Sequence, residues 1–199
     1  ARLGIGYVPQ GHEIFPLLGF GLAAWTGVAV IVEWAERVRL FRVSIGDSFR
    51  RALHLPRAAY GMSFAHFGLA VSIAGFAASA FDSQAIATVH DGSVVTLAGY
   101  ELHFMGVERV PGPNFEGNRS TVEITRNGRT VAVVHPEQRF FPLQQQTTSE
   151  TAIRTNFLAD LYVALGDGDA AGNWTLRAYW KPLVPWIWIG AVIMAFGGV

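Results

Sequence analysis

The chain has 199 residues, of which 51% are hydrophobic and 15% charged, and its formal net charge is zero. This balance gives no sign of nucleic-acid binding, which needs a basic surface. The chain contains no cysteine, so it can form no disulfide, no thiolate zinc site and no thioether-linked cofactor.

Three stretches carry no charged residue: Ile14–Val32, Ala58–Phe81 and Pro182–Val199. As helices, each would cover roughly 27–36 Å, close to the ~30 Å hydrocarbon core of a bilayer. We therefore predict three transmembrane helices. The third is truncated and begins at Lys181 (181–199). Residues 1–13 are predicted to lead into the first helix from the outer side. None of the three resembles a signal peptide, and we expect the chain to be an excerpt of a longer polypeptide.

The segment 33–57 joins the first two stretches and holds six arginines against three acidic residues. The segment 82–180 holds seven arginines against eleven acidic residues. Because an excess of basic residues in a short loop marks the cytoplasmic side, we place 33–57 inside the cell and 82–180 outside, in the periplasm of a Gram-negative bacterium. A solvated charged face without topological meaning is the alternative.

One histidine lies inside a predicted span: His66, roughly 12 Å from the cytoplasmic end of the helix over 58–81. A polar ring at that depth is costly without a partner, so it marks a functional hypothesis. Imidazole is a common axial ligand of haem iron. From the residues alone, a haem or other metal site, a proton or quinone site, and a packing histidine bonded to a neighbouring carbonyl or serine all remain open.

The helix that carries His66 is rich in small residues, which let another helix or a flat macrocycle approach its backbone. These residues are Gly61, Ser63, Ala65, Gly68, Ala70, Ser72, Ala74 and Gly75. The other five histidines show no metal-ligand spacing and are expected in surface or turn positions: His12, His54, His90, His103 and His135.

The segment 82–180 is predicted to be a β-rich periplasmic domain. Thr121–Arg126 and Arg129–Val134 flank Asn127-Gly128, a strong hairpin signal. Four more strands are expected at Gly92–Leu97, Tyr100–Val110, Asp160–Leu165 and Trp174–Trp180. The predicted fold class is thus a membrane α-helical protein with an inserted extracytoplasmic all-β domain of six or seven strands, a small barrel or sandwich.

Aromatic residues and a lysine gather where the last span begins: Tyr179, Trp180, Lys181, Trp186 and Trp188. Amphipathic rings favour the headgroup layer, so we expect an interfacial belt that anchors the protein. A surface that holds a flat hydrophobic ligand against the membrane is the alternative. No hydrolase, phosphate-binding or metalloprotease motif accompanies these residues, so the catalytic residues are unknown.

Several segments together resemble one family, in the same order and from about residue 33 to the end. They are Leu55–Val71, which includes Ala65-His-Phe-Gly-Leu-Ala-Val71, then Ser79–Asp82, Gly99-Tyr100, Gly112–Phe115, His135–Pro142, Thr147–Ile153, Asp160–Gly166 and Lys181–Trp188. The sequence resembles the CcmF family, the membrane subunit of the bacterial cytochrome c haem lyase, in its C-terminal part.

The resemblance implies a subunit of an enzyme of the inner membrane that attaches haem to apocytochrome c in the periplasm. It implies haem b as cofactor, with His66 as an axial ligand of the haem iron, reducing the iron of the incoming haem. The second ligand and the tryptophan-rich site for the substrate haem should precede this chain, which alone could not perform the reaction.

The partners implied are other haem lyase subunits of the CcmH and CcmI type, a haem chaperone of the CcmE type, apocytochrome c and membrane lipid. Two alternatives remain: a non-catalytic scaffold for haem-protein assembly, and the related haem lyase subunit dedicated to nitrite reductase. A transporter is disfavoured, because one polar residue in three spans builds no pathway.

Overall fold

The computed structural model describes residues 14–198, and the lead-in predicted over residues 1–13, with His12, lies outside them. The described chain divides into two compact units. The first, called here the β domain, comprises residues 82–181. The second, the helical unit, comprises residues 14–81 and 182–198.

The helical unit contains α1 (Ile14–Arg37), α2 (Ile45–Leu53), α3 (Arg57–Ala78) and α4 (Val184–Gly197), with a short 3-10 turn at Ser79–Phe81. Among the described residues, α1 and the helix over Arg57–Phe81 are long and apolar enough to cross a membrane. The helix α4 has 14 residues, about 21 Å, because the chain is still β-strand at Pro182. The structure therefore supplies two candidate spans rather than the three predicted.

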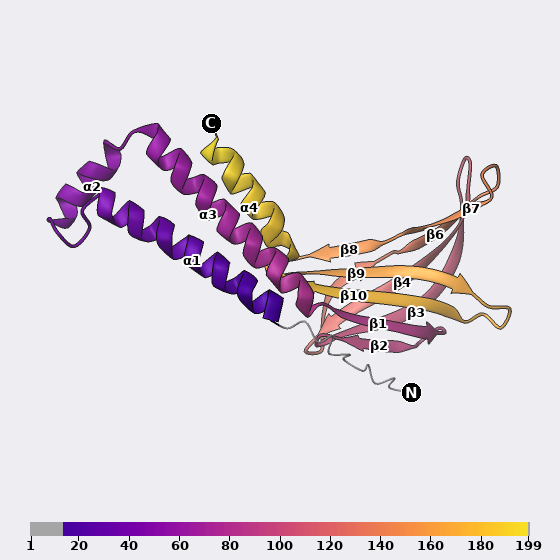
Figure 1. Ribbon diagram of the computed structural model, residues 1–199. Helices are drawn as coiled ribbons and strands as arrows, with labels where there is room; N and C mark the ends of the chain where they lie inside the picture. The colour runs from indigo at the N-terminus through magenta and orange to yellow at the C-terminus, as the bar shows by residue number, and fades with distance from the viewer. Residues whose placement is uncertain (1–13, 199) are drawn as a thin grey trace. The chain divides into compact units, whose positions relative to one another are not determined.

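The helix α3 lies between α1 and α4 (Figure 1). Its glycines face α4: a Cβ on Gly68 would lie 2.5 Å from the Gly190 carbonyl oxygen, and one on Gly75 would lie 2.8 Å from the Ile187 side chain. The Ser72 hydroxyl donates to the Ile187 carbonyl oxygen at 3.1 Å. The small-residue face predicted to admit a helix or a macrocycle thus admits a helix.

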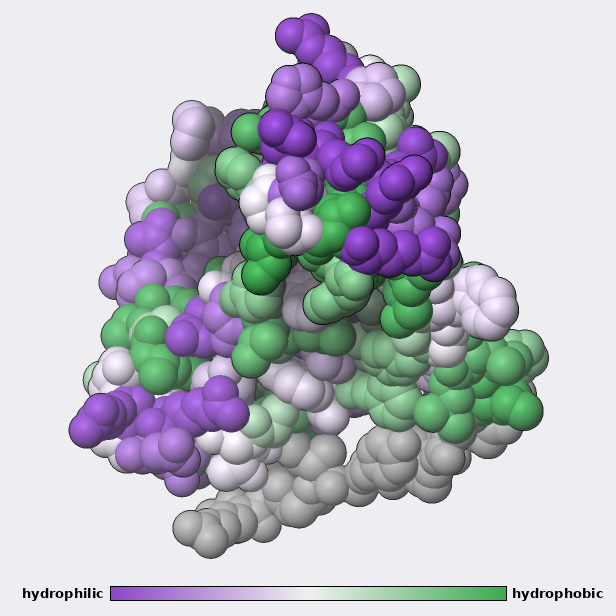
Figure 2. Space-filling model, turned by 90° about the vertical axis from the view of Figure 1, so that its left-hand side faces the viewer, coloured by the Kyte–Doolittle hydropathy of each residue, from purple (hydrophilic) through white to green (hydrophobic). Residues whose placement is uncertain are grey.

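The segment between α1 and α3 is largely helical. Its helix α2 is capped by Ser44, whose hydroxyl accepts from the Asp47 N–H. Hydrophilic residues of this segment form a patch on the surface that faces the viewer in Figure 2. Within residues 33–57, four arginines make no ion pair with any residue in the described range, which leaves this stretch basic: Arg39, Arg42, Arg51 and Arg57.

The β domain holds ten strands in two antiparallel sheets. One sheet has the order β1-β10-β9-β8, and the other has the order β2-β3-β4-β6-β7, with β5 paired to β4. The strands are β1 (Ser83–Val89), β2 (Val94–Leu97), β3 (Tyr100–Pro111), β4 (Glu116–Arg126), β5 (Arg129–Val134), β6 (Glu137–Phe141), β7 (Gln146–Glu150), β8 (Ala152–Thr155), β9 (Ala159–Gly168) and β10 (Trp174–Pro182).

The predicted hairpin is confirmed: Arg126 pairs with Arg129 across Asn127 and Gly128. Both turn residues have positive φ, 52° and 72°, as the tight turns of two-residue hairpins require. The strands expected at 92–97, 100–110, 160–165 and 174–180 are also present, the first of them beginning at Val94. The count of six or seven was too low, because it missed β1, β6, β7 and β8.

The core of the β domain lies between the two sheets, where alternate residues of each strand point inward. Leu102, Phe104 and Ile124 from one sheet and Leu161 and Leu176 from the other are almost fully buried. At about 25 cal/mol per Å² of apolar surface, full burial of each of these side chains contributes roughly 1.5–3 kcal/mol. Two facing sheets around such a core form a sandwich.

Candidate functional site

The predicted ligand His66 lies in the first half of α3, and its side chain is exposed among the described residues. It is two residues before Gly68, so it points about 200° around the helix from the face that packs on α4. Met62 and Leu69, four residues before and three after, share its side of the helix and are also exposed. His66 therefore lies at the edge of an open, apolar strip, because Ala70, four residues after it, is buried.

The hydrogen bond of the His66 ring defines its tautomer. Nδ1 lies 2.9 Å from the carbonyl oxygen of Met62. A carbonyl only accepts, so Nδ1 carries the hydrogen and a neutral ring keeps its lone pair on Nε2. Metal-ligating histidines are oriented by this kind of bond from the other nitrogen. The Nε2 atom has no hydrogen-bond partner within residues 14–198.

The same local bond occurs elsewhere, so it does not by itself mark a site. Nδ1 of His54, at the end of α2, lies 2.7 Å from the Arg50 carbonyl oxygen. His54 stands in a basic, solvated segment, whereas His66 stands in a helix apolar enough to cross a membrane. The difference between the two histidines is their surroundings: a free imidazole nitrogen is satisfied by water near His54 but not in lipid.

The remaining described histidines have local partners in the β domain. His90 lies in a turn beside the Asp91 carbonyl oxygen, His103 beside Thr125, and His135 beside Thr121. No group of three or more potential metal-ligating side chains occurs among residues 14–198. These histidines therefore form no such group within the described range.

The predicted interfacial belt is divided between two elements. Tyr179, Trp180 and Lys181 belong to β10, where Trp180 packs against the core of the β domain. Trp186 and Trp188 belong to α4, and Trp188 is 71% exposed. The Trp180 ring is partly buried there, and the interfacial belt stays a prediction.

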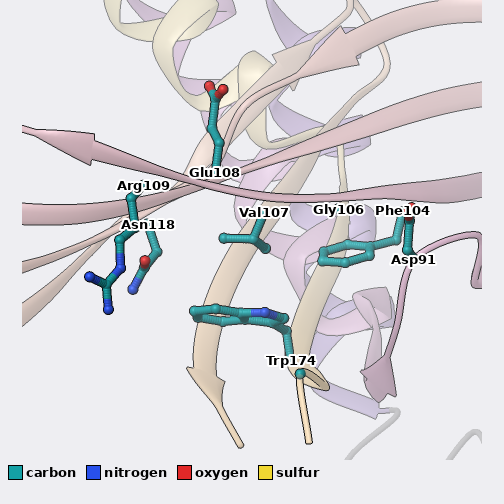
Figure 3. A pocket seen from close by; sticks show the side chains of 9 residues that line it. Asp91, Phe104, Gly106, Val107, Glu108, Arg109, Asn118 and Trp174 are labelled. Carbon is teal, nitrogen blue, oxygen red and sulfur yellow. The ribbon is translucent and has the colours of Figure 1, made fainter. Parts of the chain in front are cut away.

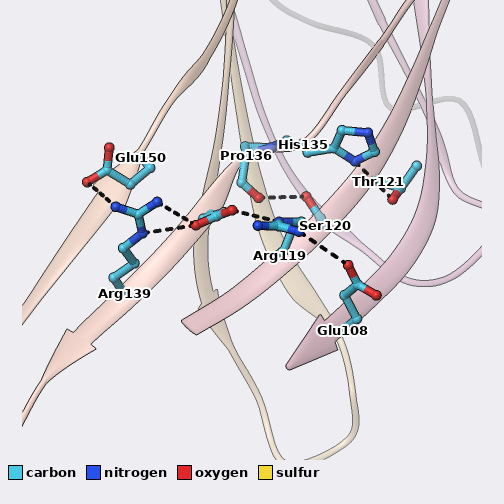
Figure 4. A network of polar contacts seen from close by, with 9 residues as sticks. Glu108, Arg119, Ser120, Thr121, His135, Pro136, Arg139 and Glu150 are labelled. Atoms are coloured by element: carbon cyan, nitrogen blue, oxygen red, sulfur yellow. Dashed lines mark hydrogen bonds and ion pairs between the residues drawn. The ribbon is translucent and has the colours of Figure 1, made fainter. Parts of the chain in front are cut away.

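The family-like segment His135–Pro142 builds an ion-pair network that the sequence did not predict (Figure 4). Glu137 is only 7% exposed and accepts from Nε of Arg119 at 2.6 Å and from Nε of Arg139 at 2.9 Å. Arg119 also reaches Glu108, and Arg139 reaches Glu150. The network joins β3, β4, β6 and β7 across one sheet.

The network holds Glu137 ionised. Burial acts to raise the pKa of this carboxyl, but the hydrogen bonds and charges of Arg119 and Arg139 outweigh it, so the pKa lies below the usual 4.5. The Arg139 guanidinium also stacks over Phe115, with its carbon 4.7 Å from the ring centre.

A second family-like segment, Asp160–Gly166, buries a polar pair. Asp160 is 6% exposed, and its Oδ1 has no hydrogen-bond partner in the described chain. Burial raises the pKa of the Tyr162 hydroxyl, and the charge of Asp160 and a hydrogen bond to it add to the rise. The Lys181 ammonium lies 5.4 Å from the centre of the Tyr162 ring.

The fold and these features define a class: an antiparallel β-sandwich inserted between apolar helices, one of which bears a histidine. Residues 80–182 match the family described as the CcmF C-terminal beta-sandwich. The cytochrome c-type biogenesis protein ccl1 of Rhodobacter capsulatus is 38% identical over 189 residues, which cover 94% of this chain and 28% of the relative. The chain belongs to the CcmF family.

Two further comparisons agree. The cytochrome c-type biogenesis protein CcmF of Escherichia coli is 34% identical over 184 residues, 92% of this chain and 27% of that protein. A solved structure, cytochrome c haem lyase CcmF, shares the fold with a TM-score of 0.63 at 19% identity, over 98% of this chain and 35% of that one. The chain thus spans between 27% and 35% of the length of these relatives.

Proposed function

We propose that this chain contributes His66 as one axial ligand of a b-type haem in a membrane haem lyase of cytochrome c biogenesis. The observation that carries the proposal is the His66 ring, with Nδ1 bonded to the Met62 carbonyl and Nε2 left available on an exposed apolar helix face. The relatives named for cytochrome c-type biogenesis and the solved haem lyase support the pathway and the reaction class.

The residues around His66 suit a porphyrin. A neutral imidazole is the form that ligates iron, and the exposed side chains of Met62 and Leu69 would cover the flat apolar ring beside it. Met62 would keep the imidazole in the correct tautomer through its carbonyl, and the apolar face would exclude water. The second axial ligand would be a histidine on another helix of the intact protein.

A bound b-type haem would supply a one-electron centre to reduce the iron of the haem that is to be joined to apocytochrome c. The proposal assigns no catalytic residue to this chain. The substrate haem would arrive from a periplasmic haem chaperone, and further lyase subunits would present the apocytochrome. The β domain would stand in the periplasm, where these partners are.

The proposed topology has three spans in the inner membrane, with α4 as the start of the third. The unpaired arginines between α1 and α3 support a cytoplasmic position for that segment. This chain contains no cysteine, so cysteine labelling tests the topology once any cysteines elsewhere in the intact protein are replaced. In intact cells, Asn127→Cys at the hairpin tip should react with a membrane-impermeant maleimide, whereas Gly46→Cys in α2 should react only after permeabilisation. The reverse pattern would overturn the orientation.

The helix α2 supports the same topology. Its apolar residues Ile45, Phe49 and Leu53 recur every four positions and are exposed by 86%, 66% and 68%, with Arg50 and Arg51 between them. A short helix with one apolar and one basic face lies in the membrane interface. We place α2 at the cytoplasmic surface of the bilayer, between the two spans.

The ligand assignment is tested by haem content. His66→Ala in the intact protein should lose the b-type haem measured after extraction, at equal protein yield. His54→Ala is the matched control, because it removes the same ring and the same backbone bond outside the membrane. Equal haem content in wild type and His66→Ala would favour the scaffold function instead.

A further inference from the structure

One half of β3 has an open edge. Residues Tyr100–His103 pair with β2, but Val107–Pro111 pair with β4 alone and have no second strand partner within residues 14–198. The change comes at Gly106, where φ is +101° and the register shifts between Phe104 and Val107. An open edge presents unpaired backbone N–H and C=O groups to which another extended chain can bind.

A pocket of about 420 Å³ adjoins this edge, between the two sheets of the β domain. Its apolar wall consists of Phe104, Val107 and Trp174, with the indole ring lying under Val107 (Figure 3). The indole also lies against Gly168, where a Cβ would lie 2.9 Å from the ring. Because only glycine leaves this space, the position of the indole depends on Gly168.

The pocket also holds polar side chains without partners. Arg109 and Asn118 stand opposite each other on β3 and β4, and neither side chain makes a hydrogen bond or ion pair with any described residue. Asp91 lies at the other end, 3.7 Å from the position of a Cβ on Gly106. Glu108 points away from the pocket and contacts Arg119 instead (Figure 3).

We infer that this edge and pocket bind an extended polypeptide segment, which adds as a strand beside Val107–Val110. Alternate residues of a strand share a face, and Val107 and Arg109 share the face of the Trp174 ring (Figure 3). The bound segment would place an apolar or aromatic side chain on Trp174 and an acidic side chain two residues away, at Arg109 and Asn118. Backbone pairing would give affinity, and the pocket would give specificity.

Edge protection alone does not account for these residues. A bulge, charges and a proline are devices that keep a sheet edge from pairing indiscriminately, and Gly106, Glu108 and Pro111 supply them. Protection of the edge does not require a pocket. It also does not explain why the Arg109 guanidinium is unpaired near the Trp174 indole. These features favour a partner whose charge complements Arg109 over a second, identical edge. The proposal requires no haem and stands apart from the role of His66.

The test uses the intact protein in lipid nanodiscs and fluorescein-labelled peptides. Two peptides, Ser-Thr-Glu-Thr-Phe-Thr-Val-Ser and its reversed sequence, cover both strand directions, and binding is followed by fluorescence anisotropy. At least one of the two peptides should bind the wild-type protein. Arg109→Glu should weaken that binding at least tenfold, about 1.4 kcal/mol. A peptide with lysine in place of the glutamate should recover binding to Arg109→Glu. Arg129→Glu, the same charge change at the hairpin, is the control.

Hydrogen exchange supplies the second readout. Bound peptide should slow amide exchange at Val107–Val110 and leave the distant hairpin around Asn127 unchanged. Trp174→Ala, with unchanged circular dichroism, should abolish binding, whereas His66→Ala should not affect it. The inference fails if neither peptide binds at about 1 mM, if Arg109→Glu binds equally well, or if the edge is instead covered by a second copy of the protein in a dimer that Arg109→Glu dissociates.

Discussion

The Nε atom of Arg119 lies 2.6 Å from Oε1 of Glu137, although the two residues are 18 positions apart in the sequence. Arg119 comes from β4 and Glu137 begins β6, so the bond spans two strands paired at this point. Arg139 holds the other carboxylate oxygen at 2.9 Å. The buried carboxylate is thereby neutralised from two sides, which lets an ionised group remain inside the sheet.

Glu137→Gln should destabilise the β domain by about 2–3 kcal/mol at pH 7, since it leaves two guanidinium groups without their shared carboxylate. The value lies below the usual range for a fully buried pair because both arginines are about a third exposed. Urea unfolding followed by tryptophan fluorescence measures it. Glu116→Gln, which removes an exposed carboxylate, should change stability by less than about 0.5 kcal/mol.

The effect of Glu137→Gln should depend on pH. Because the pKa of Glu137 is lowered in the folded protein, its stabilisation is present above 4.5 and is lost as pH falls through the folded value. The difference between wild type and variant should therefore shrink below pH 4.5. If the difference in free energy of unfolding between wild type and variant stayed constant into the acid range, the ionised form of Glu137 would not be the source of the stabilisation.

Asp160→Asn should lower the pKa of Tyr162 toward 10.0, because the substitution removes the negative charge that opposes ionisation of the hydroxyl. Tyrosinate absorbance, with Tyr162→Phe to identify the signal, measures the change. In the wild type the pKa of Tyr162 is raised in the folded protein. The contribution of Tyr162 to the free energy of unfolding is therefore fully present below pH 10.0 and declines as pH rises toward the pKa of the folded state. An unchanged titration would leave burial as the sole cause.

Gly68→Ala should weaken the packing of α3 on α4 by about 1–3 kcal/mol, because the added Cβ would lie 2.5 Å from the Gly190 carbonyl oxygen. Thermal unfolding in detergent measures the loss. Gly21→Ala is the matched control in α1, since a Cβ there meets nothing within 4 Å. The control should be neutral or slightly stabilising, because alanine favours helix over glycine. Equal effects at both positions would contradict the packing.

A polarity-sensitive fluorophore attached to Phe49→Cys should report an apolar environment and be quenched by lipids with a nitroxide on the acyl chain. The same fluorophore at Arg51→Cys, on the basic face of α2, should be quenched less. The chain has no native cysteine, so each label reports a single site once any cysteines elsewhere in the intact protein are replaced. Equal quenching at the two positions would argue against an interfacial position of α2.

Local signals in the sequence predicted the elements that depend on neighbouring residues. Asn127-Gly128 defined its hairpin because both residues must have positive φ, a property of the turn itself. Strands such as Gln146–Glu150, with Gln, Thr, Ser and Glu, have no apolar face and exist because β6 pairs with them. Which strands meet across the sheets depends on contacts distant in the sequence, and so the order could not be derived.

The candidate site shows the same division. His66 was identified from the sequence because a histidine in an apolar stretch is costly. The small residues around it indicated that another element approaches α3 closely. Only the structure shows that this element is α4, which packs against Gly61, Gly68 and Gly75. The apolar spacing of Ile45, Phe49 and Leu53 was readable, although the arginines around it suggested a plain loop. The pocket at Trp174 brings β3 and β10 together and had no sequence signal.

The proposed function depends most on the bond between His66 Nε2 and iron. Electron paramagnetic resonance of the oxidised intact protein, isolated with its haem, reports this bond through the spin state of the iron. We expect a low-spin signal from two histidine ligands, a high-spin signal in any haem retained by His66→Ala, and recovery of the low-spin signal when imidazole is added. A low-spin signal that is the same in His66→Ala without imidazole would contradict the assignment.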